Sequence, residues 1–540
     1  MNFKHLIFYF TTVLCGSFSL IANAQQLQLD EDGIAESCTS IMVGRKASTD
    51  GSVITSHSCD SNYRTWLNIV AHKKNKPDSK MKIYWGTLHT ESIFDSTTMI
   101  NKGEIPDVEE TFAYLNTAYP CLNEKQLGIG ESTITGKKEL VNTKGLFLIE
   151  ELEKIVLQRC TNARDAISLI GKLVKQYGYA DWGECITIAD KREVWQLEIF
   201  GSGTDEIGAV WAAQRIPDDH VGISANIPRI GILDLKDTDH FMASDNVTTL
   251  AQKMGWWDGK EPFKFWKAYS GGKPFGIREF FVLSSLAPSL QLKFEADELP
   301  FSVKPESKIS VRDVMRFYRT TYEGSPYDAT KNLMVTQKTK NDKGELVEEK
   351  IMSPVANPFL SPDTRTLFNE LKPGSVERQR TIAVPQCSYS HIIQLRDWLP
   401  DEIGGVAWFS FDNPGESPRF PIFSGNLTLP KSFNICMQHR FREDAAGWWF
   451  RKANKLATVK WGIARKYIEE GVNEFENTAF EELPMVQKRA LELYKDKEVG
   501  VKELKYKEFL TNYTNHFAYS AMYKWNEISE TLWALFARGF

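Results

Sequence analysis

The chain has 540 residues, of which 42% are hydrophobic and 25% are charged, a composition typical of globular proteins with a sizeable core. Its net charge is −5, and it contains no long basic run, which excludes a nucleic-acid binder because such proteins carry a basic surplus. The length would suit roughly three to four domains of usual size, although a single hydrolytic domain can also be larger than usual.

The first residues have the features of an export signal. Lys4 and His5 precede an apolar stretch over residues 6–21, and Ala22-Asn23-Ala24 forms a small-x-small cleavage pattern. The alternative is a retained membrane anchor, but about sixteen residues interrupted by Thr, Ser and Gly are short for a membrane span. We therefore expect residues 1–24 to be removed, and the mature protein to be periplasmic or extracellular without stable membrane insertion.

Residues 25–37 are a short polar segment with four acidic residues and no basic one. They predict a spacer or propeptide, so the folded domain is expected over residues 38–540. The sequence has eight cysteines: Cys15, Cys38, Cys59, Cys121, Cys160, Cys185, Cys387 and Cys436. Removal of the signal leaves seven, which requires at least one free thiol or an intermolecular bridge.

The first folded element is predicted to be a β-hairpin. Residues 39–43 and 52–56 have strand character, and the turn chemistry of residues 46–51 includes the pair Asp50-Gly51. Cys38 then lies at the open end of the hairpin, and residues 57–60 return to the same edge. We expect Cys38 to be a close neighbour of this returning stretch, which contains His57 and Asp60.

Helices and further strands follow. Apolar spacing predicts a helix near residues 148–156 and another over residues 163–177, opened by Thr161 or Asn162 and closed by Gly178. Strand-like runs are predicted at residues 185–189, 193–199, 209–215, 221–226 and 406–411. The middle, about 250–375, is less regular and includes a surface loop at residues 340–344. A helical region covers about 440–540. This order suggests stacked layers of sheets and helices, an α+β fold.

Cys38 is the residue with the most distinctive potential chemistry. An α-amino group has a pKa near 7.7–8.0, so an N-terminal cysteine can use its own amine as the base that deprotonates its thiol. The thiolate, not the thiol, attacks a carbonyl carbon. This chemistry requires cleavage after Ser37, whose small side chain would let the thiol reach the Ser37 carbonyl. Judged from position alone, a buried or paired structural cysteine is the favoured interpretation.

Several separate sequence blocks resemble one family. Residues 38–52 (CTSIMVGRKASTDGS) resemble the mature start of the dipeptidase A family of N-terminal-nucleophile (Ntn) cysteine hydrolases, which are related to the secernins. Further similar blocks follow in the same order at residues 123–130, 211–226, 322–328, 388–390 and 394–405. Several blocks in one order are much more specific than a single motif.

The resemblance implies a four-layer αββα sandwich with a helical C-terminal region. It also implies hydrolysis of short peptides, dipeptides above all, and maturation by removal of the residues before Cys38. The implied chemistry needs no metal and no cofactor. The sequence leaves open whether the protein forms a homo-oligomer.

The wider group of relatives, which includes penicillin V and bile-salt acylases, implies roles for two more residues. Asp60 stands where an aspartate steadies the α-amino group of the nucleophile. Asn226 stands where an asparagine donates to the oxyanion that develops on the scissile carbonyl. The catalytic set implied by the resemblance is therefore Cys38, Asp60 and Asn226.

Three further residues are candidates for binding substrate. His57 stands where relatives tend to have arginine, and its alternative is a polar residue at the end of a strand. Glu131 or Thr133 occupies the region of the acylases' first oxyanion asparagine, so a backbone N–H is an alternative donor there. Arg229 could hold a substrate carboxylate, because a guanidinium group matches its geometry.

Two other functions remain open at this point. An acylamidase of the same fold could cut a fatty, aromatic or bile-type amide, with the aromatic stretch at 256–275 lining either kind of pocket. A non-catalytic envelope protein that retains the fold would keep residues 25–37. A zinc hydrolase is disfavoured because the sequence has no His-Glu-x-x-His motif and no Cys-x-x-Cys pair.

Overall fold

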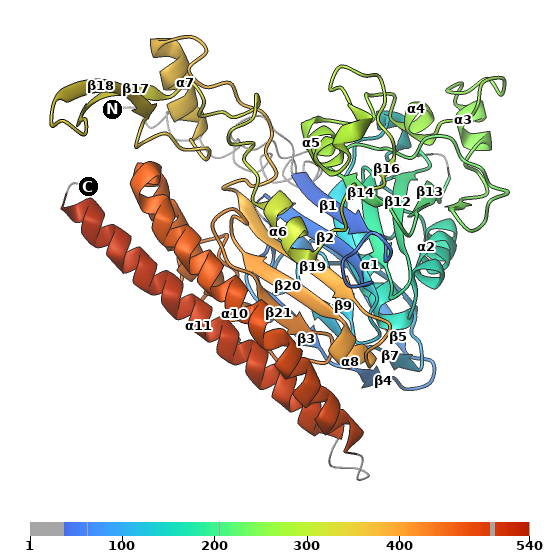
Figure 1. Cartoon of the computed structure of the whole chain (residues 1–540). Coiled ribbons are helices and arrows are strands. Elements are labelled where there is room, and N and C mark those ends of the chain that lie inside the picture. The colour runs from blue at the N-terminus through green and yellow to red at the C-terminus, as the bar shows by residue number, and fades with distance from the viewer. Residues whose placement is uncertain (1–36, 62, 205, 497–502, 539–540) are drawn as a thin grey trace, which may run out of the picture. The chain divides into compact units, whose positions relative to one another are not determined.

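The computed structural model describes residues 37–61, 63–204, 206–496 and 503–538 (Figure 1). The predicted signal segment and the spacer up to residue 36 lie outside the described residues. In the part of the chain that is described, no helix is both long and apolar enough to cross a membrane.

The predicted N-terminal hairpin is confirmed. Strand β1 (Ser37–Val43) pairs antiparallel with β2 (Val53–Asp60), and the register places Cys38 opposite Cys59. In the turn, Asp50 accepts hydrogen bonds from the backbone and hydroxyl of Ser52, and Gly51 has a φ of 87°. An Asp-Gly pair suits such a turn because glycine adopts positive φ without steric cost.

The hairpin lies inside a seven-stranded antiparallel sheet with the order β16-β14-β1-β2-β19-β20-β21. Its other strands are β14 (Val221–Ser224), β16 (Ser302–Val303), β19 (Cys387–Leu395), β20 (Val406–Phe411) and β21 (Phe420–Phe423). The predicted strand at 406–411 is thereby confirmed, and the strand predicted at 221–226 is confirmed as far as Ser224, where β14 ends. Every residue of β1, β2, β19 and β20 is buried, so both faces of the sheet are covered in its centre.

A second, eight-stranded sheet has the order β15-β13-β12-β11-β10-β9-β8-β3. Its strands are β3 (Asn68–Val70), β8 (Tyr114–Asn116), β9 (Leu122–Asn123), β10 (Gly128–Thr133), β11 (Glu184–Ala189), β12 (Val194–Gly201), β13 (Ala209–Ile216) and β15 (Phe241–Ala243). Strands β11 to β13 confirm three predicted runs. Short two-stranded sheets pair β4 (Lys73–Lys74) with β7 (Glu110–Thr111) and β5 (Lys80–Trp85) with β6 (Ile100–Pro106).

The two large sheets pack against each other, with β1 and β2 contacting β10 and β11. The approach is closest at Gly130, where an added Cβ would lie 2.2 Å from the carbonyl oxygen of Ser56. Nearby, the hydroxyls of Thr55 and Thr187 share a hydrogen bond of 2.5 Å across the interface. This close packing brings β10 against the strands that hold Cys38.

Helices cover the sheets. Helix α2 (Ala163–Tyr177) contacts β11, β12 and β13, follows α1 (Ile149–Arg159), and begins at the predicted cap Asn162, whose side chain accepts from the backbone of Asp165. The C-terminal region is helical, as predicted, with α9 (Ala446–Ala457), α10 (Trp461–Lys495) and α11 (Glu503–Ala537). Helices α10 and α11 lie side by side and both contact β21 (Figure 1).

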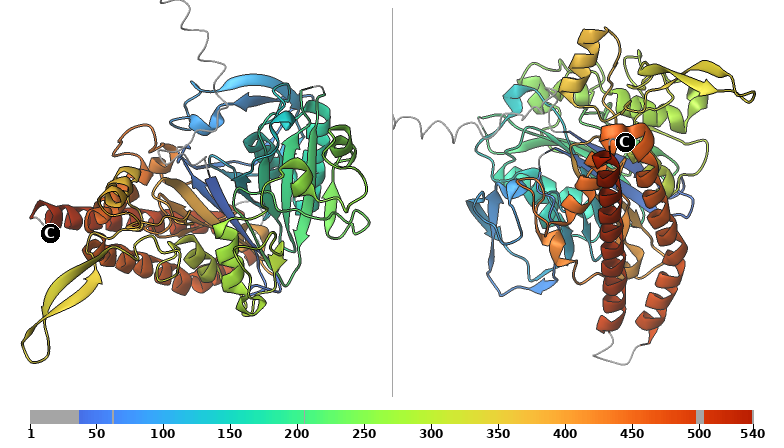
Figure 2. Two further views of the ribbon diagram at one scale, coloured as in Figure 1. Left: turned by 90° about the horizontal axis from the view of Figure 1, so that it is seen from above. Right: turned by 90° about the vertical axis from the view of Figure 1, so that its left-hand side faces the viewer.

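The middle of the chain consists of short elements joined by long loops. Its helices are α3 (Thr249–Lys253), α4 (Phe265–Tyr269), α5 (Ile277–Leu286), α6 (Val311–Tyr318) and α7 (Pro362–Leu371), and a further short helix, α8 (Asp401–Gly404), follows later. A largely exposed hairpin of β17 (Met334–Lys340) and β18 (Leu346–Met352) projects from this region (Figure 2). Its turn is the predicted surface loop at 340–344.

Candidate active site

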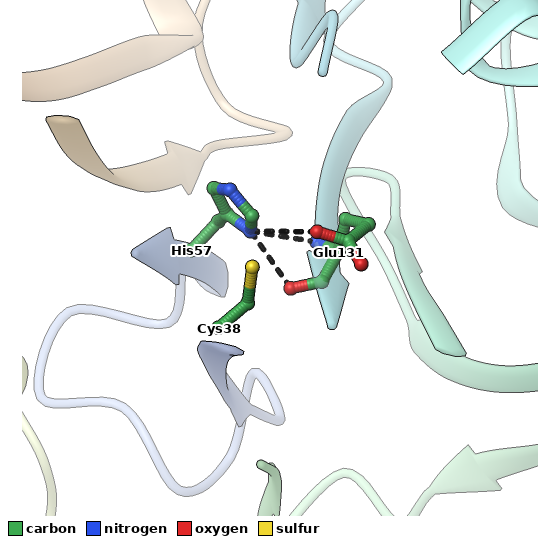
Figure 3. Close-up of side chains that lie close together, drawn as sticks. All are labelled: Cys38, His57 and Glu131. Atoms are coloured by element: carbon green, nitrogen blue, oxygen red, sulfur yellow. Dashed lines mark hydrogen bonds and ion pairs between the residues drawn. The ribbon is translucent and has the colours of Figure 1, made fainter. Parts of the chain in front are cut away.

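Cys38 is the second residue of β1 and is fully buried. Its Sγ, a ring nitrogen of His57 and a carboxylate oxygen of Glu131 all lie within 4.8 Å of one another (Figure 3). His57 comes from β2 and Glu131 from β10, so the cluster forms where the two sheets meet. The predicted proximity of Cys38 to the end of β2 is confirmed.

Asn226 holds the main-chain nitrogen of Cys38, which donates to its Oδ1 at 3.0 Å. The residue follows β14 and adopts a φ of 66°, a left-handed conformation that asparagine tolerates better than most residues. Its backbone N–H donates to Ser132 Oγ, and its Nδ2 donates to the carbonyl oxygen of Thr133 at 2.7 Å. Asn226 is therefore fixed by both sheets and directly contacts Cys38.

Arg278 was not identified from the sequence, yet it donates hydrogen bonds to both Cys38 and Asn226. From the start of α5 its Nη1 donates to the carbonyl oxygen of Cys38 at 2.7 Å and to Thr39 Oγ1 at 3.0 Å, and its Nη2 donates to Asn226 Oδ1 at 2.8 Å. Burial lowers the pKa of Arg278 to about 10, so the guanidinium stays charged at neutral pH. No local pattern reveals it, because it is 240 residues away from Cys38 in sequence.

Asp60 lies at the end of β2, opposite Ser37 in the register. Its Oδ2 accepts from Ser58 Oγ at 3.0 Å and from Arg380 Nη2 at 2.8 Å, and Arg380 also donates to Ser37 Oγ at 2.6 Å. Its Oδ1 is buried and has no hydrogen-bond partner in the described chain. One carboxylate oxygen therefore remains able to accept a further donor beside the Ser37–Cys38 bond.

His57 does not replace the positive charge of an arginine. Burial lowers its pKa to about 4, so the ring is neutral at neutral pH. Its Nδ1 lies 2.7 Å from the carbonyl oxygen of Glu131, and the ring stacks against His391 with centroids 5.4 Å apart. The geometry therefore shows His57 as a neutral group that connects β2 to β10.

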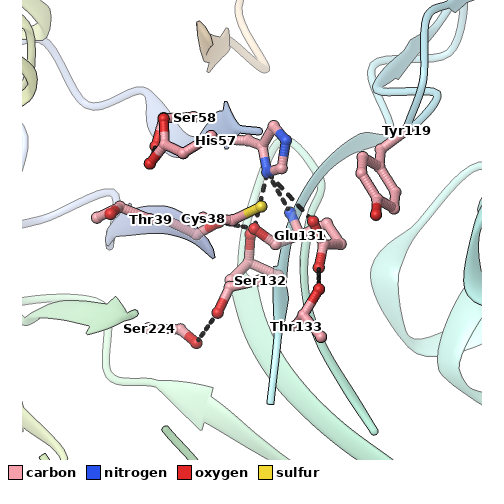
Figure 4. Close-up of polar contacts among 12 residues, drawn as sticks. Cys38, Thr39, His57, Ser58, Tyr119, Glu131, Ser132, Thr133 and Ser224 are labelled. Atoms are coloured by element: carbon pink, nitrogen blue, oxygen red, sulfur yellow. Dashed lines mark hydrogen bonds and ion pairs between the residues drawn. The ribbon is translucent and has the colours of Figure 1, made fainter. Parts of the chain in front are cut away.

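Glu131 and Glu184 form a carboxyl pair next to Cys38. They lie on the adjacent strands β10 and β11, and their carboxyl groups interact directly. Thr133 Oγ1 donates to Glu131 Oε1 at 3.2 Å (Figure 4). Burial raises the pKa of both groups. Burial also raises the pKa of the Cys38 thiol well above its usual value, so a nearby base is needed to form the thiolate.

The surroundings of Arg229 do not favour the predicted contact with a substrate carboxylate. Its guanidinium is buried and donates to the backbone carbonyl oxygens of Ile223 and Pro300 at 3.2 and 2.6 Å. The backbone N–H of Arg229 also donates to Glu198 Oε1. These contacts give Arg229 a structural position, whereas Arg278 and Arg380 contact Cys38 and Ser37.

The seven cysteines of the described chain are all free and buried. Cys38 and Cys59, which face each other across the hairpin, interact through their thiols. Among the described residues, the cluster of Cys38, His57 and Glu131 is the group that could hold a metal ion. Its sulfur, nitrogen and oxygen donors would suit zinc, but an ion there would occupy the sulfur of the candidate nucleophile.

Comparison with known proteins identifies the family of this chain. The family model of peptidase family C69 matches residues 37–474. The chain is 25% identical over 398 residues to a "Probable dipeptidase" of Latilactobacillus sakei, covering 72% of this chain and 74% of that protein. It is 23% identical over 479 residues to "Dipeptidase A" of Lactobacillus helveticus, covering 86% and 88%. The match begins one residue before Cys38 and spans every residue of the cluster, so the chain belongs to peptidase family C69.

Proposed function

We propose that this protein is an exported cysteine-type dipeptidase, matured by cleavage between Ser37 and Cys38. The observation that carries the proposal is the position of Cys38 at the start of the first strand. Its nitrogen is held by Asn226, and its sulfur lies against the Glu131 carboxyl group. The dipeptidases among its relatives support dipeptides as substrates. The paired sheets with helices on them support a four-layer αββα sandwich.

In the proposed reaction, the freed α-amine of Cys38 takes the proton from Sγ, and the thiolate attacks the scissile carbonyl carbon. The amine returns the proton to the leaving amino group, an acyl-enzyme forms, and water releases the product. His57 is a weak base at this position, because burial lowers its pKa to about 4. A neutral α-amine with a pKa near 8 matches the task at neutral pH.

Three neighbouring side chains have supporting roles in the proposed reaction. Asp60 accepts from the new α-ammonium group through its Oδ1, which has no other partner in the described chain. Asn226 orients the amine through its Oδ1, and its amide donates toward the developing oxyanion. Arg278 holds the carbonyl oxygen of Cys38 in place.

The test combines N-terminal sequencing of the exported protein with dipeptide assays of wild type and Cys38→Ala. We expect the mature chain to begin at Cys38 and the variant to lose hydrolysis by at least 10³-fold, about the loss seen when a catalytic nucleophile is removed. Cys160→Ala is the matched control, because Cys160 is also buried and free but lies at the end of α1. An active protein that keeps residue 37, or an active Cys38→Ala variant, would contradict the proposal.

A further inference from the structure

Within the described residues, no charged cation pairs with the carboxyl groups of Glu131 and Glu184. Both side chains are buried, and Glu131 Oε2 and Glu184 Oε2 have no hydrogen-bond donor there. The basic side chain that the described chain places at Glu131 is His57, whose Nδ1 lies 3.8 Å from Oε2 and which is neutral at neutral pH. Asp60, the acid on the other flank of Cys38, differs because Arg380 pairs with it at 2.8 Å.

Glu131 also lies close enough to Cys38 Sγ to contact the α-nitrogen of the substrate residue that Cys38 attacks. In an amino acid the α-nitrogen is about 2.5 Å from the carbonyl carbon, as standard bond lengths require. A thiolate attacks that carbon from about 3–3.5 Å, so the α-nitrogen of the attacked residue lies within about 6 Å of Sγ. A carboxylate oxygen of Glu131 lies within 4.8 Å of the Cys38 Sγ and can reach a group in that position.

We propose that Glu131, backed by Glu184, binds the free α-ammonium group of the substrate residue whose carbonyl Cys38 attacks. The inference rests on the proposed function and narrows it to substrates with an unblocked N-terminus. The substrate supplies the cation that the buried carboxyl pair lacks, and a charge-assisted hydrogen bond forms on binding. Thr133, which donates to Glu131 Oε1, holds the carboxyl group in place for this contact.

The same arrangement predicts that an uncharged acyl chain is a poor substrate. An N-acyl amino acid would occupy the position without a cation, so the buried carboxyl pair would stay uncompensated. Sites built to bond a polar substrate group reject analogues that lack it far more strongly than apolar pockets reject an extra methylene. Glu131 therefore selects dipeptides over the substrates of acylamidases.

The test uses two substrates that differ in one group, L-alanyl-L-alanine and N-propionyl-L-alanine, of which the second lacks the α-amine. We expect mature wild type to prefer the dipeptide by at least about 10²-fold in kcat/KM. Glu131→Gln keeps the shape and removes the charge. It should lower kcat/KM for the dipeptide by about 10²-fold, mainly through KM, and leave the propionyl substrate within about threefold. Glu416→Gln, which changes a buried acid between β20 and β21, is the matched control and should keep the wild-type preference.

Three outcomes would overturn the inference, and they can be told apart. Glu131 does not bind the α-ammonium group if Glu131→Gln lowers kcat/KM equally for both substrates. The same follows if wild type hydrolyses both substrates equally well. In either case the proposed hydrolase function stands. If wild type that begins at Cys38 cuts neither substrate, the proposed function fails as well. The wild-type comparison needs no variant, so the inference stays testable even if Glu131→Gln does not fold.

Discussion

At the residue scale, the site is a set of side chains that hold the two ends of one residue. Asn226 accepts from the nitrogen of Cys38, Arg278 donates to its carbonyl oxygen, and the sulfur projects toward His57 and Glu131. Fixing both ends of the Cys38 backbone keeps the sulfur of this proposed nucleophile in place before substrate binds. Such preorganisation lowers the cost of reaching the transition state.

Removal of the Asn226 side chain tests this arrangement. Glycine adopts positive φ freely, so Asn226→Gly removes the amide without straining the backbone. We expect kcat for dipeptide hydrolysis to fall by roughly 10²–10³-fold, as when an oxyanion donor is lost, with the fold retained by circular dichroism. Asp78→Gly is the control, since Asp78 also has positive φ (59°) but is exposed. Unchanged kcat in Asn226→Gly would remove Asn226 from the catalytic set.

The buried imidazole of His57 makes the stability of the folded protein depend on pH. Its pKa is lowered from 6.5 to about 4, so between these values the unfolded chain binds a proton that the folded chain does not. Stability contributed by this group therefore falls as the pH drops from about 6.5 to 4 and is constant above 6.5. At about 1.4 kcal/mol per pKa unit, the loss approaches about 3 kcal/mol.

Urea unfolding of wild type and His57→Gln at pH 7 and pH 4.5 measures this contribution of His57 to the free energy of unfolding. The difference in unfolding free energy between the two proteins should shift in favour of the variant at the lower pH, because glutamine does not titrate. An equal loss in both proteins would show that other groups cause the acid sensitivity.

At the element scale, the sequence pattern predicted some elements well and others not at all. Helix α2 has apolar periodicity, an asparagine cap and a closing glycine, and it was placed to the residue. Strands β3, β8 and β9 have only two or three residues each, too few to show a period, and the sequence did not reveal them. Their strand form depends on pairing with neighbours in the sheet rather than on local preference.

The contact between the two sheets is the element-scale feature that the site depends on most. In Gly130→Ala the new Cβ would meet the Ser56 carbonyl oxygen at 2.2 Å and Thr187 Oγ1 at 2.7 Å, so β10 must move away from β2. We expect a loss of about 1–3 kcal/mol or more in unfolding free energy, and lower activity because Glu131 is the next residue. Gly231→Ala, where nothing lies within 4 Å of the new Cβ, should change neither quantity. Full stability in Gly130→Ala would show that the sheets can separate without cost.

At the scale of the whole molecule, the C-terminal helices are part of the hydrolase core. The family model ends at residue 474, so α11 lies outside it, yet α11 contacts α9 and β21. Its Trp525 is fully buried and donates from Nε1 to Asn454 Oδ1 on α9 at 3.1 Å. The region after the family match therefore contributes to the stability of the sheet that holds Cys38.

Trp525→Ala measures that contribution. Loss of a buried tryptophan costs about 3–5 kcal/mol, and we expect that decrease in a single cooperative unfolding transition. Trp533→Ala is the matched control on the same helix, because Trp533 is 57% exposed and should cost far less. A separate early transition in Trp525→Ala, with the remaining domain unaffected, would mean that the helices fold independently of the sheets.

The sequence by itself determined the hairpin, the position of Cys38 at its open end beside His57 and Asp60, the two central helices and the family. These features depend on neighbouring residues, whose turn chemistry and periodicity can be read locally. Only the tertiary structure placed Glu131 at the sulfur, joined Arg278 to Asn226 and turned Arg229 onto backbone carbonyls. The reason is that these contacts join distant segments across two packed sheets. Their geometry depends on how closely the sheets approach, which no local pattern encodes.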